Sequence, residues 1–145
     1  SIDAGGEVRV VLDTAHTPDA IGHALRVARE LTSGRILCVS GGYEGRHRSG
    51  LIALAGAVAT NCDEAILTCG DPQTGDHAYL DTALPPHFPR CTVSRRSDAI
   101  ARALSHARMG DCIVITGADG SEQCRDREII RALCGHEERI TTHAG

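Results

Sequence analysis

Strand-like and helix-like patterns of apolar residues alternate along the chain. Short apolar runs bounded by turn residues are typical of buried strands, and apolar residues spaced three and four positions apart are typical of amphipathic helices. The strands predicted from these runs cover residues 7–12, 35–40, 64–68, 90–93 and 111–116, with an edge strand around 139–142. The predicted helices cover residues 18–33, 51–60, 98–107 and 126–133, with a short one at 77–84.

Capping residues set several of these helix ends. Thr17 is placed to cap the first helix, with Pro18 at its first position, and Gly34 is expected to stop it. In the same way Ser97 is expected to cap the helix that Gly110 stops. Strands that alternate with helices of this length imply right-handed β-α-β crossovers. We therefore expect a three-layer, Rossmann-like α/β fold whose mainly parallel sheet has about five or six strands, with helices on both faces.

The length of 145 residues fits one domain, so the interpretation is a single unit over residues 1–145. The sequence starts with Ser1 rather than Met, and strand-like residues follow almost at once, which suggests a fragment of a longer chain. The seven cysteines include no C-x-x-C pair, and we find no secretory signal. These features predict reduced thiols and a cytoplasmic location.

Composition excludes several kinds of function. All 15 basic residues are arginine, so a phosphate-binding, Schiff-base or carbamylated lysine cannot come from this chain. The net charge of −4 and the 2% of aromatic residues argue against nucleic acid as a partner. No apolar stretch has the length of a membrane span, so no membrane partner is expected. The eight histidines lack metal-ligand spacing, and no metal held by this domain alone is predicted.

Candidate chemistry gathers in the loops that follow the strands, because parallel sheets bind ligands at the carboxyl ends of their strands. The loop with the most specific pattern places Asp13 and His16 between a strand and a helix N-terminus. A carboxylate there can accept from a ribose hydroxyl, and an imidazole can donate near a phosphate. The alternative is that the two side chains only fix the turn by local hydrogen bonds. Chemistry alone favours neither interpretation.

Several motifs in order resemble one family. The segment VVLDTAHTPDA at 10–20 resembles the D-Y-A-H-[TN]-P-D-A signature that opens the C-terminal domain of Mur ligases, most closely the tripeptide synthetases of the MurE type. The Gly-rich loop after residue 40, the Asp71–Pro72 pair, the segment 117–122 and the D-R-E at 126–128 stand where that family has its further motifs. The resemblance extends over nearly the whole chain.

The resemblance implies an ATP-dependent ligase of peptidoglycan synthesis. Such enzymes activate a carboxylate as an acyl phosphate, which the amine of an incoming amino acid attacks to form an amide. ATP and Mg²⁺ would be bound mainly by a central domain absent here, which agrees with the lack of a G-x-x-G-K-[ST] motif. The partners implied are the N-terminal and central domains and the amino-acid substrate, and the domain alone would be inactive. Asp13 and His16 would face the nucleotide.

The same resemblance assigns candidate contacts to the amino acid, although this sequence departs from the family at each loop. Arg46 matches the arginine that grips the amino-acid carboxylate, a role that suits a bidentate guanidinium. Asp71 and Gln73 stand in place of the Asn and Arg of D-N-P-R, and Glu122 remains of G-K-G-H-E. Two explanations stay open: a ligase for another amino acid or acceptor, or a degenerate, non-catalytic binding or scaffold homologue on the same fold.

Overall fold

Strands and helices alternate through the chain in the computed structural model, which describes residues 2–3, 7–41, 48–68, 82–93, 95–117, 120–134 and 140–143. The strands are β1 (Ile2–Asp3), β2 (Glu7–Asp13), β3 (Ile36–Ser40), β4 (Glu64–Thr68), β5 (Arg90–Val93), β6 (Cys112–Ile115) and β7 (Ile140–His143). The helices are α1 (Pro18–Leu31), α2 (Arg48–Asn61), α4 (Arg96–His106) and α5 (Gly120–Cys134).

The strands form one sheet in the order β1-β2-β6-β3-β4-β5, and β7 also pairs with β2. Every pairing is parallel except that of β1, which runs antiparallel to the start of β2. Because β6 occupies the other side of β2, β1 and β7 share its outer edge. The expected mainly parallel sheet is confirmed, and so is the edge strand near the C-terminus.

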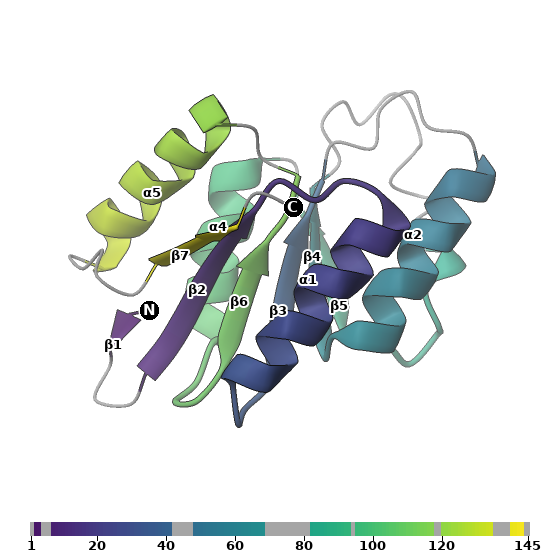
Figure 1. Ribbon diagram of the computed structural model, residues 1–145, viewed down its shortest axis with the longest axis horizontal. Helices are drawn as coiled ribbons and strands as arrows, with labels where there is room; N and C mark the ends of the chain where they lie inside the picture. The colour runs from purple at the N-terminus through teal and green to yellow at the C-terminus, as the bar shows by residue number, and fades with distance from the viewer. Residues whose placement is uncertain are drawn as a thin grey trace.

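Two apolar layers cover the sheet, because successive strand residues point to opposite faces. Val11, Cys38 and Val114 pack against α1 and α2 on one face. Val10, Val39 and Ile113 pack against α4 and α5 on the other. Figure 1 shows α1 and α2 in front of the strands and α4 behind them. The three-layer arrangement predicted from the apolar pattern is therefore confirmed.

The start of α1 follows the local sequence. Thr17 is the N-cap residue, and its Oγ1 accepts a hydrogen bond from the backbone N–H of Ala20 at 3.3 Å. Pro18 occupies the first helical position, where its missing N–H costs no hydrogen bond. The helix ends at Leu31, before the predicted stop. Gly34 instead serves a close backbone approach, since its N–H donates to the carbonyl of Gly110 at 2.9 Å.

Two helix starts differ from the sequence prediction. Helix α4 begins at Arg96 with Arg95 in the cap position, so Ser97 is not its cap. Helix α5 begins at Gly120 rather than near Asp126, which places Glu122 in a helical turn instead of a loop. Both differences bring new residues to the carboxyl edge of the sheet, where the candidate site lies.

Candidate functional site at the carboxyl edge of the sheet

The sheet has a switch point at β6, which lies between β2 and β3 although it follows both in sequence. Open α/β sheets bind ligands at the carboxyl ends of strands beside such a point. Gly117, just after β6, has a φ of +79°, a left-handed conformation that favours glycine. A side-chain carbon added there would lie 3.5 Å from the carbonyl oxygen of Gly41 and 4.0 Å from that of Ala15. The chain segments leaving β2, β3 and β6 therefore meet at this edge.

Asp13 ends β2 at this junction, and its side chain is only 4% exposed. Its Oδ1 accepts a hydrogen bond from the backbone N–H of Ala15 at 2.7 Å, which closes a tight turn. The described part of the chain offers no partner to the other carboxylate oxygen. A buried polar oxygen without a partner is rare in folded proteins, so Asp13 keeps the capacity to accept one more hydrogen bond.

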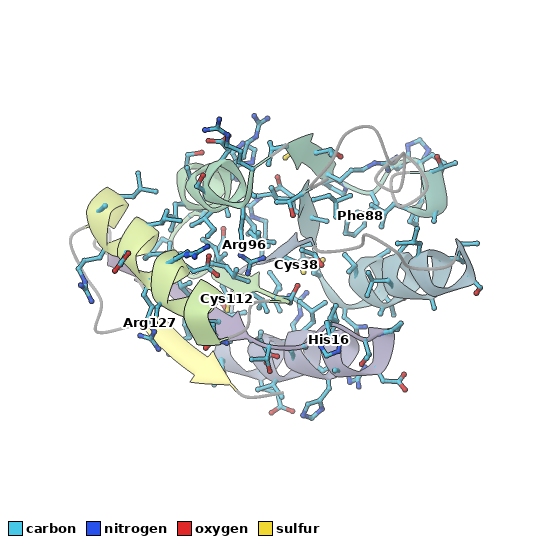
Figure 2. The ribbon with its side chains drawn as sticks, turned by 90° about the horizontal axis from the view of Figure 1, so that it is seen from above. His16, Cys38, Phe88, Arg96, Cys112 and Arg127 are labelled. Atoms are coloured by element: carbon cyan, nitrogen blue, oxygen red, sulfur yellow. The ribbon has the colours of Figure 1, made fainter. Side chains whose placement is uncertain are left out.

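His16 lies three residues further, immediately before the cap of α1, and is exposed to solvent. Its Nδ1 lies 3.3 Å from the carbonyl oxygen of Thr14, a contact within the same turn. Figure 2, which looks down on the carboxyl edge, shows His16 beside the start of α1. The turn-fixing hydrogen bonds considered above are thus present for both residues, and within the described ranges only one of the two carboxylate oxygens of Asp13 takes part in them.

Buried hydroxyl groups lie beneath the junction. Thr116 Oγ1 lies 3.1 Å from both the carbonyl oxygen of Val39 and the hydroxyl of Ser40. Thr68 Oγ1 donates to the carbonyl oxygen of Ser40 at 3.4 Å. These contacts tie the ends of β3, β4 and β6 together, so that the loops above them start from a rigid base.

An arginine that sequence reasoning overlooked joins the junction to α5. The Nε of Arg96 lies 3.1 Å from each carboxylate oxygen of Asp126, and its Nη2 lies 3.0 Å from Oδ2. The same Nη2 donates to the carbonyl oxygen of Thr116 at 3.0 Å. Figure 2 labels Arg96 between α4 and α5. The D-R-E motif at 126–128 was the available signal, but it indicated only the start of a helix.

The predicted amino-acid contacts are less completely described. Arg46, Asp71 and Gln73 lie outside the described residues. Glu122 lies in the first turn of α5, and its side chain is also outside them. Asp13 and His16 are therefore the predicted site residues whose side chains the structure places, and it places them in one turn.

The described residues show neither a metal-binding cluster nor a membrane-spanning helix. No group of three or more His, Cys, Asp and Glu side chains there could hold a metal ion. None of the described helices combines the length and apolar character needed to cross a membrane.

The chain was compared with known proteins. Residues 2–119 match the family model described as Mur ligase, glutamate ligase domain. A UDP-N-acetylmuramoyl-L-alanyl-D-glutamate--2,6-diaminopimelate ligase from Syntrophomonas wolfei is 32% identical over 122 residues, covering 80% of this chain and 25% of that protein. The chain thus spans about a quarter of the length of this relative.

Solved structures agree on the fold. A structure of a UDP-N-acetylmuramoyl-L-alanyl-D-glutamate--2,6-diaminopimelate ligase superposes with a TM-score of 0.75 at 22% identity, over 90% of this chain and 31% of that one. E. coli FolC in complex with ADP superposes with a TM-score of 0.61 at 17% identity, over 94% of this chain and 32% of that one. At these identities the likeness establishes the shared fold.

Proposed function

The chain belongs to the Mur ligase, glutamate ligase domain family, and from this premise we propose that it is the C-terminal domain of an ATP-dependent, amide-forming ligase. The reaction joins the carboxylate of an acceptor peptide to the amine of an incoming amino acid, in the synthesis of peptidoglycan precursors. The similarity to a ligase named for 2,6-diaminopimelate supports this class of reaction. This similarity favours a ligase over the alternative of a non-catalytic binding or scaffold homologue.

The buried carboxylate of Asp13 is the observation that carries the nucleotide-binding part of the proposal. Its second oxygen, which has no partner among the described residues, lies at the end of β2, beside the switch point of the sheet. A ribose hydroxyl would supply the missing donor, and His16 stands beside it at the N-terminal end of α1, where the helix dipole favours phosphate. The ADP named in the FolC structure is a nucleotide of this kind.

The amino acid would bind across the loops that follow β3, β4 and β6. We propose that Arg46 grips its carboxylate through two parallel hydrogen bonds. Asp71 and Gln73, in the loop after β4, would contact its polar groups, and Glu122, in the first turn of α5, would pair with an ammonium group. We propose that these four residues select the amino acid, since in the sequence they follow three different strands.

The remaining chemistry would come from other domains of a longer chain. This domain has no lysine and no G-x-x-G-K-[ST] loop, so it lacks the groups that usually hold the phosphates of ATP together with Mg²⁺. We propose that a central domain holds both, and that the present domain closes on it and is inactive alone. The cysteines described are free thiols, which suits the proposed cytoplasmic location.

The test is phosphate release from MgATP by the full-length protein, given a UDP-muramoyl-dipeptide acceptor and a panel of amino acids that includes 2,6-diaminopimelate. Turnover that depends on one amino acid and falls about a hundredfold in Asp13→Ala, with a smaller loss in His16→Ala, is expected. Asp19→Ala, a change at an exposed position in the first turn of α1, serves as the matched control. A folded protein without turnover on any amino acid would overturn the proposal.

A further inference from the structure

Arg96 binds two points of the chain that lie on either side of residues 117–125. Its guanidinium binds the carbonyl oxygen of Thr116, directly after β6, and the carboxylate of Asp126, in the second turn of α5. The residues between these two points, 117–125, include Gly117 at the junction of the strand ends and Glu122 in the first turn of α5. One side chain therefore holds both ends of this segment.

The ion pair has the burial and geometry of a rigid contact. The side chain of Asp126 is 2% exposed and that of Arg96 is 23% exposed. A buried carboxylate is stable only when it is paired, so Asp126 cannot leave the guanidinium without a large cost. The flat guanidinium also reaches the carboxylate and the carbonyl at once, which a lysine ammonium on its flexible stem does not reproduce.

Resting on the proposed function, we propose that Arg96 is a positioning residue for the incoming amino acid. It acts through segment 117–125, whose path determines where Glu122 stands relative to the loops after β3 and β4. Arg96 does not itself touch the substrate. When the contacts of Arg96 are lost, segment 117–125 can shift, and the affinity for the amino acid falls. The affinity for ATP, which we propose depends on Asp13 and His16, does not change.

A second contact of the same kind, made by Arg35, provides a matched control at the amino ends of the strands. The Nη2 of Arg35 lies 2.9 Å from Oδ2 of Asp111 and 2.9 Å from the carbonyl oxygen of His106. This arrangement repeats the arginine, aspartate and carbonyl of the Arg96 bridge, but it precedes β3 and β6 instead of following them. A replacement of Arg35 therefore tests the effect of losing such a contact away from the site.

The experiment compares Arg96→Lys, Asp126→Asn and Arg35→Lys in the full-length protein. We measure kcat, the KM for ATP, the KM for the amino acid that supports turnover, and amide hydrogen exchange of residues 117–125. Arg96→Lys and Asp126→Asn are expected to raise the amino-acid KM about tenfold and to speed exchange in the segment, with the KM for ATP within about twofold. Arg35→Lys should leave both KM values and this exchange unchanged.

The outcomes separate the two proposals. An active wild type whose Arg96→Lys variant keeps its amino-acid KM, or changes both KM values equally, overturns the positioning role and leaves the ligase function intact. The same holds if Arg35→Lys gives the same KM change, because the effect is then one of general stability. A wild type without amino-acid-dependent turnover overturns the proposed function, and the role of Arg96 in it falls as well.

Discussion

Thr116 and Ser40 are joined by a hydrogen bond of 3.1 Å between their hydroxyl groups, at the ends of two neighbouring parallel strands. Both side chains are buried, at 0% and 1% exposure. The hydroxyl of Thr116 also lies 3.1 Å from the carbonyl oxygen of Val39, and its one proton can be donated to either oxygen. The hydroxyl of Thr116 thus lies within hydrogen-bonding distance of two oxygens of β3, and the ends of β3 and β6 are joined through it.

Removing this hydroxyl should weaken the domain. Thr116→Val keeps the shape of the side chain but removes the contacts of its hydroxyl with Ser40 and with the carbonyl of Val39, at an expected cost of about 1 kcal/mol in the free energy of unfolding. Urea unfolding of the domain measures it. In a double-mutant cycle with Ser40→Ala, we expect a coupling energy of about 1 kcal/mol. Strictly additive changes would show that the two hydroxyls do not interact.

Two glycines should respond oppositely to alanine. In Gly41→Ala the added carbon would overlap Oγ1 of Thr68, so the Thr68 side chain or the backbone at residue 41 must shift, and the free energy of unfolding should fall. In Gly56→Ala the carbon would meet nothing within 4 Å, and the position lies inside α2. That variant should gain roughly 0.5–1 kcal/mol, the usual advantage of alanine over glycine in a helix. Thermal unfolding of both variants checks the opposite signs.

The stability of the fold should depend on acid through Asp111. Burial raises the pKa of this carboxyl, but hydrogen bonds from the backbone N–H groups of Arg108 and Arg35, and the Arg35 guanidinium, outweigh burial and leave the pKa below its usual value. A carboxyl whose pKa is lower in the folded than in the unfolded state stabilises the fold above about pH 4, and this contribution is lost as the pH falls through the folded-state pKa.

Asp111→Asn tests this dependence. We expect the variant to lose about 1–3 kcal/mol at pH 7, because the replaced carboxylate accepts hydrogen bonds from two N–H groups and a guanidinium. The gap between variant and wild type should narrow as the pH falls below about 4, because the unfolded wild-type chain then takes up a proton on this carboxyl more readily than the folded one. Denaturant unfolding across pH 3–7 measures the gap, and a constant gap would contradict the assignment.

Thiol reactivity should follow burial. Burial raises the pKa of Cys112 to about 11, and contact with Cys38 together with burial raises the pKa of Cys62. Both side chains are buried, whereas Cys124 is exposed on α5. Since the thiolate is the reactive form, Cys124 should react with a maleimide in the folded domain while Cys62 and Cys112 react only after unfolding. Peptide mapping of the labelled sites gives the order, and labelling of Cys112 in the native domain would contradict it.

Local sequence predicted most of the fold because the elements carry their own signals. The apolar runs at 64–68 and 90–93 match β4 and β5 residue for residue, and Thr17 and Pro18 mark the start of α1. The start of α5 could not be read in the same way. Its first turn contains Gly120 and Ser121, which are poor helix formers. The Arg96–Asp126 contact holds that helix in place across a distance in sequence that no local pattern reveals.

The candidate site was predicted in part for a similar reason. The loop around Asp13 and His16 has a pattern specific enough to identify, and the structure places both residues in one turn. The contacts of Arg96 depend on packing between α4, α5 and the end of β6, so its role appears only once the elements are assembled. Arg46, Asp71, Gln73 and Glu122 keep the status of predictions.

The partners of β2 also bear on how the chain comes to be folded. Within this domain β2 is synthesised before β6 and β7, yet it pairs with both of them. Until then, β1 can pair only with the start of β2, and the rest of the apolar segment that ends in Asp13 has unpaired backbone groups on both sides, the state in which strands most readily associate with other chains. Contacts this distant in sequence also slow folding. The candidate nucleotide site is therefore among the last parts of the domain to form, and a ribosome-bound nascent chain that lacks β7 should not yet display it in finished form.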